Sequence, residues 1–165
     1  MPTETKDRDL QEIGRSAFAS IQEMVTALEC DYDRLTELRD ERANLEESAL
    51  QAWDEENGEE LKDLADTAGD CTSREEAEER IHEDPLSVEV RSGWTSVGEL
   101  MEAEEFVILL GTGGPAIRIR GELDDGQPSR AWLEVQDWFT PWTEYIGASQ
   151  DVLLTYAQQF YFGEH

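Results

Sequence analysis

The sequence predicts an α+β fold in which an acidic, helical N-terminal arm precedes a small antiparallel sheet. Through the first half of the chain, apolar residues recur every three or four positions, which is the period of an amphipathic helix. From Leu86 onward they alternate with polar residues, which is the period of a half-buried strand. We therefore expect an acidic arm over residues 1–84 and, over residues 85–165, a sheet of about four strands with a packed C-terminal helix.

The arm is expected to begin with one long helix over residues 7–56, whose apolar seam faces another helix. Asn57-Gly58 is typical of a helix C-cap and turn, so a second helix is expected over residues 59–66. Asp31 and Arg42 occupy two seam positions, and they could pair if the seam folds back on itself. This pattern leaves a helical hairpin and a coiled-coil dimer both open. The apolar seam residues are Leu10, Ile13, Ala17, Ile21, Met24, Leu28, Leu35, Leu38, Leu45, Ala49 and Ala52.

A short helix ends the arm, and a meander of strands follows it. Ser73 and Glu76 form the pattern S-x-x-E, which predicts a helix start, and Asp84-Pro85 predicts its end. Strands are expected over residues 86–94, 106–110, 116–123 and 130–138, and the turn residues 111–114 and 124–126 separate the last three. Ser149 is expected to cap a final helix that lays its apolar side on the sheet.

Acidic residues dominate the composition: 40 Asp and Glu against 13 Lys and Arg give a net charge of −27. Residues 1–84 carry −18 of this charge and residues 85–165 carry −9. Such a surplus argues against direct binding of nucleic acid and of anionic membranes, which both attract Lys and Arg. It favours a basic protein or nucleoprotein as the partner. No apolar run is long enough to cross a bilayer and no signal peptide is evident, so we expect a cytoplasmic protein.

The sequence contains no pattern that indicates catalysis. The segment from Gly111 to Gly114 lacks the Lys-Ser/Thr of a phosphate-binding loop and leads into a strand, so a turn is the better interpretation. His82 and His165 have no partner at metal-ligand spacing, and the acidic clusters lack the spacing of a calcium loop. We therefore expect a protein that is not an enzyme, with no metal and no cofactor.

Two groups of residues are candidates for binding a partner. Carboxylates along a rigid helix can approximate the phosphates of a duplex, and the residues expected to do so are Glu46, Glu47, Asp54, Glu55, Glu56, Glu59 and Glu60. Strand alternation places a second group on one sheet face, namely Arg118, Arg120, Trp132 and Trp138. This face could bind an acidic or aromatic partner group, or its residues could form cross-strand ion pairs and stack on one another.

The string GTGGPAIRIRGELDDGQPSRAWLEVQDWFTPWTEY, residues 111–145, resembles a segment of small uncharacterised proteins from phages, plasmids and other mobile elements. The strong acidity resembles that of antirestriction and anti-CRISPR proteins that mimic DNA, although this likeness is one of charge and not of motif. The resemblance implies an inhibitor that acts in the bacterial cytoplasm on a nuclease or CRISPR effector of the host. The alternative is an adaptor or assembly protein that dimerises through the arm and binds a protein through the Arg/Trp face.

Overall fold

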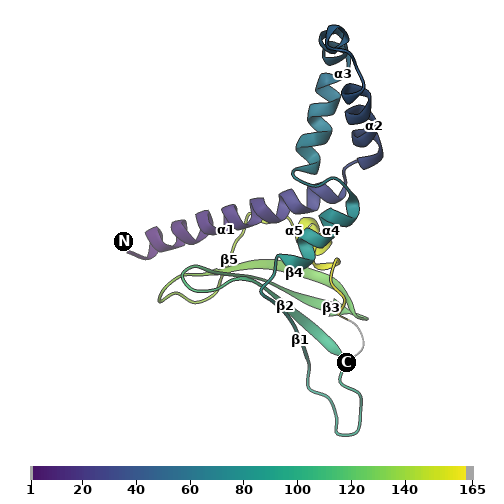
Figure 1. The fold of residues 1–165 in the computed structure, drawn as a ribbon. Helices are drawn as coiled ribbons and strands as arrows, with labels where there is room; N and C mark the ends of the chain where they lie inside the picture. The colour runs from purple at the N-terminus through teal and green to yellow at the C-terminus, as the bar shows by residue number, and fades with distance from the viewer. Residues whose placement is uncertain (1, 163–165) are drawn as a thin grey trace. The chain divides into compact units, whose positions relative to one another are not determined.

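The computed structural model describes residues 2–162, and the burial of side chains from residue 6 to residue 162 (Figure 1). This part of the chain forms five helices and one five-stranded antiparallel sheet, so the predicted α+β fold is confirmed. A two-residue strand in the aromatic connection after residue 138 adds to the four strands expected. The elements in order are α1 (Pro2–Leu28), α2 (Tyr32–Ala43), α3 (Glu47–Ala68), α4 (Arg74–Glu83), β1 (Ser87–Ser92), β2 (Ala103–Gly111), β3 (Ala116–Asp124), β4 (Gln127–Gln136), β5 (Thr143–Glu144) and α5 (Gln150–Ala157).

The chain divides into two compact units. The sheet unit comprises Met1–Gln22 and Ile81–His165, and the helical unit comprises Glu23–Arg80. The first 22 residues, which composition assigned to the arm, thus group with the sheet. The division into an arm of residues 1–84 and a sheet domain of residues 85–165 stays a prediction.

The sheet has the strand order β1-β2-β3-β4-β5, and each strand is antiparallel to its neighbour. This is the meander that the alternating sequence predicts, because each short connection joins adjacent strands. Between β3 and β4, Asp125 and Gly126 both have positive φ, 51° and 77°. Positive φ at both central residues defines the type I′ turn for which Asp-Gly is favoured, and the predicted hairpin is confirmed.

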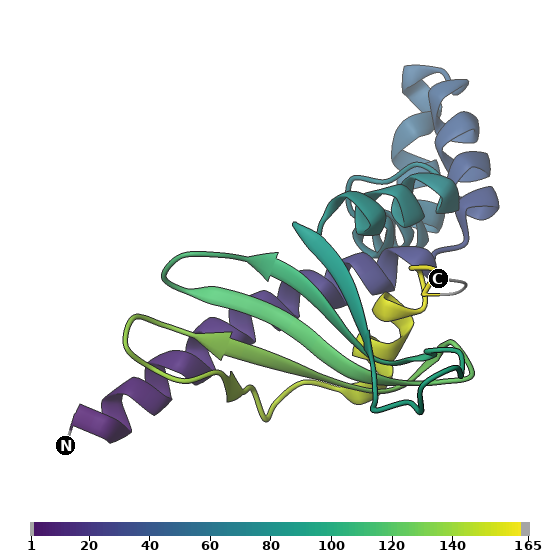
Figure 2. The same cartoon turned by 90° about the horizontal axis from the view of Figure 1, so that it is seen from below.

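One face of the sheet forms the core of its unit, and α5 and the first part of α1 cover it (Figure 2). Ile108, Ile119 and Leu133 are fully buried on this face. Gly14 lets α1 approach the sheet unit closely, because a Cβ there would lie 2.6 Å from the ring of Tyr145. In the part of α1 that belongs to the sheet unit, the residues buried at helical spacing are Leu10, Gly14, Phe18 and Ile21.

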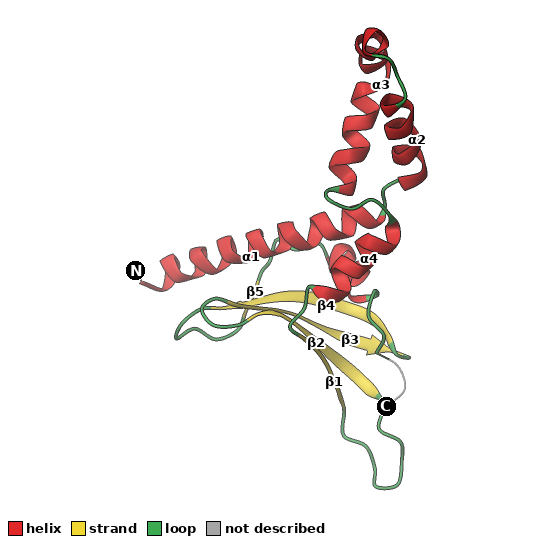
Figure 3. Cartoon of the chain, in the orientation of Figure 1, coloured by secondary structure: helices red, strands yellow, loops and turns green. Residues whose placement is uncertain are grey.

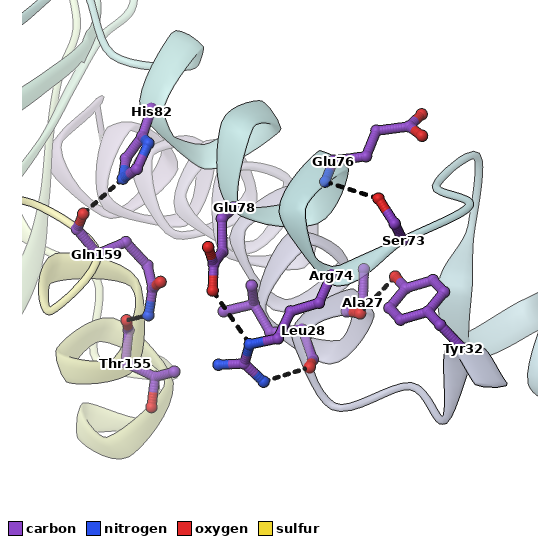
Figure 4. Close-up of polar contacts among 10 residues, drawn as sticks. All are labelled: Ala27, Leu28, Tyr32, Ser73, Arg74, Glu76, Glu78, His82, Thr155 and Gln159. Carbon is purple, nitrogen blue, oxygen red and sulfur yellow. Dashed lines mark hydrogen bonds and ion pairs between the residues drawn. The ribbon is translucent and has the colours of Figure 1, made fainter.

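Two side-chain contacts hold α5 to the end of α4 within the sheet unit. The buried hydroxyl of Tyr156 donates a hydrogen bond to Asp84 at 2.6 Å. The ring nitrogen Nε2 of His82 donates a hydrogen bond to the backbone carbonyl oxygen of Gln159 at 2.6 Å (Figure 4). Ser149 stands at the N-cap of α5 as expected, but its side chain makes no capping hydrogen bond.

In the helical unit, the long helix expected over residues 7–56 is interrupted twice (Figure 3). The first interruption is set by Asp31, which becomes the N-cap of α2 and accepts from the backbone N–H of Arg34 at 3.1 Å. The second lies at residues 44–46. The expected turn at Asn57-Gly58 is wrong, because both residues lie inside α3, and the helix expected over residues 59–66 is the second half of α3.

The C-terminal end of α1 is capped from other parts of the helical unit. The last carbonyls of a helix have no partner within it. Here the hydroxyl of Tyr32 donates to the carbonyl of Ala27 at 2.6 Å, and the guanidinium of Arg74 donates to that of Leu28 at 2.9 Å (Figure 4). The last turn of α1 contains no basic residue, so Arg74 supplies the positive charge that the helix dipole favours there.

The start of α4 confirms the pattern S-x-x-E. The backbone N–H of Glu76 donates to the hydroxyl of Ser73 at 3.1 Å, as the sequence predicts. The Glu76 carboxylate turns back to accept from the backbone N–H and the hydroxyl of Thr72. These bonds satisfy donors at the helix start, and they fix the direction in which α4 leaves the preceding loop.

The raised pKa values of two tyrosine hydroxyls lead us to expect a loss of stability at alkaline pH. The pKa of Tyr32 is raised from 10.0 to about 12, mainly by burial. The pKa of Tyr156 is also raised, first by burial and second by the hydrogen bond to Asp84. Both hydroxyls ionise near pH 10 in the unfolded chain. Their contribution to stability is therefore complete below pH 10 and is lost as pH rises through the folded pKa. The urea midpoint should fall as pH rises from about 10 to about 12, with circular dichroism as the measurement.

The double variant Tyr32→Phe, Tyr156→Phe should show a smaller fall over this pH range, because neither ring can ionise. Tyr161→Phe serves as the control, because the Tyr161 side chain is 82% exposed. An equal fall in the double variant and in the wild-type chain would contradict the assignment.

Candidate partner-binding surfaces

An antiparallel hairpin of α2 and α3 carries the acidic candidate residues. Arg34 pairs with Glu60 through two hydrogen bonds of 2.7 and 3.1 Å, and Arg42 pairs with Asp54 through two of 2.9 and 3.1 Å. The residue numbers rise along α2 as they fall along α3, so both pairs belong to one antiparallel register. The apolar seam, which includes Arg42, thus folds back on itself within one chain. This arrangement is the helical hairpin, one of the two alternatives that the sequence leaves open.

These ion pairs divide the seven candidate carboxylates into two classes. Hydrogen bonds from Arg42 and Arg34 lower the pKa of Asp54 and of Glu60, so these two are engaged in holding the hairpin. Among the described residues, no ion pair involves the other candidates, and all of them are exposed. The carboxylates that remain free of ion pairs are Glu46, Glu47, Glu55, Glu56 and Glu59.

Two further carboxylates extend this surface, and the sequence reasoning missed them. Asp63 and Asp66 are exposed, and they follow Glu55 and Glu59 at steps of three or four residues along α3. Residues at these spacings share one helix side. We call these four residues the acidic stripe. The sequence contained the signal, but the expected turn at Asn57-Gly58 separated the second half of the stripe from the first.

The basic residues of the sheet lie on the face opposite the core, and each has a carboxylate partner. Arg118 pairs with Glu134 at 2.7 Å, Arg120 with Glu105 at 3.6 Å, and Arg130 with Glu122 at 3.6 Å. Arg91 also pairs with Glu105. The register explains these pairs, because Arg118 stands opposite Glu134 and Arg130 stands opposite Glu122. The cross-strand interpretation therefore describes this face, and the use of the face by a partner stays a prediction.

Tryptophan rings cover the arginines of this face. The guanidinium carbon of Arg118 lies 3.9 Å from the ring centre of Trp142, which is cation–π geometry. Trp132 has Arg120 and Arg130 at 5.8 and 5.5 Å and donates a hydrogen bond to Glu134 at 3.1 Å. Trp138 was expected with them but lies beyond the end of β4.

Several large apolar side chains on the sheet unit are exposed, and the sequence reasoning did not single out those between β1 and β2. The loop between β1 and β2 contains Trp94, Val97, Leu100 and Met101, which are between 74% and 107% exposed. The connection between β4 and β5 contains Trp138 and Phe139, at 68% and 97%. Exposed aromatic side chains in groups are typical of interaction surfaces.

Histidines, cysteines and acidic clusters are the side chains that metal binding or nucleophilic chemistry would use. The described residues contain no group of three or more His, Cys, Asp or Glu residues that could hold a metal ion. His82 is engaged with Gln159, and His165 lies outside the described residues. Burial, followed by the charge of Asp31, raises the pKa of the Cys30 thiol, which disfavours the reactive thiolate at neutral pH. In the same part of the chain, no helix has both the length and the apolar character that crossing a membrane requires.

Comparison with known protein families, with curated proteins and with solved structures finds no match to the chain. The resemblance of residues 111–145 to mobile-element proteins therefore stays a prediction, as does the likeness in charge to DNA mimics.

The packing of the sheet face predicts unequal roles for two arginines. Arg118→Ala should lower the free energy of unfolding by about 2 kcal/mol, because Glu134, with a side chain only 14% exposed, would lose its charged partner. Arg91→Ala is the matched control and should change stability little, because that side chain is 67% exposed. Urea denaturation measures both, and an equal loss in the two variants would contradict the burial argument.

Proposed function

We propose that the chain is a non-enzymatic inhibitor from a mobile element, of the antirestriction or anti-CRISPR type. It would occupy the positively charged nucleic-acid channel of a bacterial nuclease or CRISPR effector and keep nucleic acid out. The observation that supports this proposal is the acidic stripe of α3, whose carboxylates are exposed and not used in ion pairs.

The spacing of the stripe suits a surface that binds phosphate. Successive carboxylates are about 4.5 to 6 Å apart along the helix axis, at a rise of about 1.5 Å per residue. Phosphates of one DNA strand follow each other every 3.4 Å or so along the duplex axis. The stripe therefore has a lower linear charge density than one DNA strand, and Glu46, Glu47 and Glu56 supply further charge on the same hairpin.

The hairpin presents this charge on a defined scaffold. The helical unit carries 21 acidic and 6 basic side chains, a net charge of −15, which opposes its own compact state. The pairs of Arg34 and Arg42, together with the buried Leu35 and Leu38, offset this repulsion and keep the two helices in register. A channel rich in Lys and Arg would then meet carboxylates that are already in position, so little ordering would accompany binding.

The role of the stripe can be tested with two triple variants that remove the same amount of negative charge, one from the stripe and one from a control position. Glu55→Gln, Glu59→Gln and Asp63→Asn remove three carboxylates of the acidic stripe, and among the described residues none of the three forms an ion pair. The wild-type chain, tagged, is used to capture its partner from a bacterial lysate, and the purified partner is then titrated by calorimetry. We expect the triple variant to bind more than about tenfold more weakly. Wild-type affinity should also fall steeply as salt is raised through the range of about 50 to 200 mM.

The control carries Asp7→Asn, Asp9→Asn and Glu12→Gln, which remove the same charge from exposed positions of α1 within the sheet unit. It should bind like the wild-type chain. A short DNA duplex should compete with the chain for the partner. The proposal fails if both triple variants lose affinity equally, if neither does, or if the partner does not bind nucleic acid.

A further inference from the structure

The turn between β4 and β5, residues 137–140, holds a bulky aromatic residue in a strained backbone conformation. Phe139 has a φ of 66°, a region that bulky residues rarely adopt. Its side chain is 97% exposed, so burial of the ring does not offset the strain. Strain of this kind persists only where the surrounding structure enforces it, and it is concentrated at binding and active sites.

Hydrogen bonds on both sides of Phe139 enforce its conformation. The Asp137 carboxylate accepts from the backbone N–H of Trp138 at 2.8 Å, and the Thr140 hydroxyl accepts from that of Asp137 at 2.9 Å. The backbone N–H of Thr140 donates to the Asp137 carbonyl at 3.1 Å and closes the turn. Gln136 Nε2 donates to the Thr140 carbonyl at 3.1 Å. The turn is therefore fixed before any partner binds.

Trp138 lies beside Phe139, with ring centres 6.5 Å apart, and it rests on Gly114 of the connection between β2 and β3. A Cβ at Gly114 would lie 2.0 Å from Trp138 Nε1, so the position needs glycine for this contact. Trp138 remains 68% exposed. We call Trp138 and Phe139 the aromatic anchor, because the pair projects a rigid apolar surface into solvent.

We infer that the aromatic anchor inserts into an apolar pocket with a basic rim on a protein partner. The aromatic rings supply the apolar chemistry, and the surrounding chain supplies the charge. Residues 131–162 contain no Lys or Arg, and their acidic residues other than Glu134, which is paired with Arg118, are Asp137, Glu144 and Asp151. Rigid aromatic residues bind with little loss of conformational freedom, so a preformed turn contributes affinity that the acidic stripe alone does not.

The same charge pattern argues against other occupants. Stacking on nucleic-acid bases is normally joined by Lys and Arg that bind the backbone, and membrane surfaces favour basic residues beside aromatic ones. A second copy of the chain would bring another −27 against the first. That the partner's pocket has a basic rim is inferred in part from the function proposed above. That the pocket is apolar is inferred from the aromatic anchor itself.

Phe139→Gly tests the anchor and its strain together. Glycine adopts positive φ without strain, so the urea midpoint should not fall below that of the wild-type chain. Affinity for the captured partner should nevertheless fall by more than about tenfold in calorimetry. Tyr161→Ala is the control, because it removes another aromatic ring that is 82% exposed and should leave affinity unchanged.

A photo-crosslinking residue at position 139, in the otherwise complete chain, identifies the partner independently of the acidic stripe. The control position is Asp125, an exposed turn residue that also has positive φ. We expect a protein adduct at position 139 only. An excess of unlabelled wild-type chain should abolish the adduct, and an excess of Phe139→Gly should not. Absence of the adduct, or equal competition by both chains, overturns the inference.

The two proposals fail separately. Loss of affinity in the α3 triple variant without loss in Phe139→Gly keeps the inhibitor function and overturns the anchor. The reverse keeps the anchor and removes the electrostatic function. Sedimentation with phosphatidylcholine vesicles that depends on Phe139 would show a lipid surface instead, and a dimer that Phe139→Gly dissociates would show a second copy. Either outcome overturns the inference.

Discussion

Scarcity of positive charge is the constraint on which the rest of this structure depends. The chain has 13 Lys and Arg against 40 Asp and Glu, and within the described residues seven arginines form ion pairs. Six of them pair where two elements meet, between α2 and α3 and across neighbouring strands, and Arg74 pairs with Glu78 within α4. The pairs between elements reduce repulsion at these junctions, and the carboxylates of the acidic stripe remain exposed on α3.

Local turn and capping patterns predicted the hairpin turn at Asp125-Gly126 and the helix start at Ser73, and hydrophobic period was sufficient to predict the fold class. It did not predict the breaks in the long helix, because neither Gly nor Pro lies between Ser16 and Asn57. The first break comes from the local N-cap of Asp31, and the hairpin around the second break is held by tertiary ion pairs between α2 and α3. Conversely, Gly58 is tolerated inside α3 at a propensity cost of about 1 kcal/mol.

The candidate surfaces were predicted in part, for equally physical reasons. Strand alternation placed Arg118, Arg120 and Trp132 on one face, and cross-strand ion pairing was already one of its two interpretations. Composition located the acids but could not separate Asp54 and Glu60, which hold the hairpin, from Glu55 and Glu59, which do not. The strain at Phe139 was beyond the sequence, because local propensity disfavours positive φ for phenylalanine and only the bonds of Asp137 and Thr140 impose it.

The acidic stripe has a consequence for the water around the molecule. A row of fixed anions in which Lys62 is the one cation between Glu55 and Asp66 gathers an atmosphere of mobile sodium or potassium ions, as a polyelectrolyte does. A basic surface that docks there displaces these ions into bulk solution, and their mixing entropy favours the complex. Association through α3 should thus be driven by the release of small counter-ions more than by heat, and the ionic composition of the surrounding solution would set its strength.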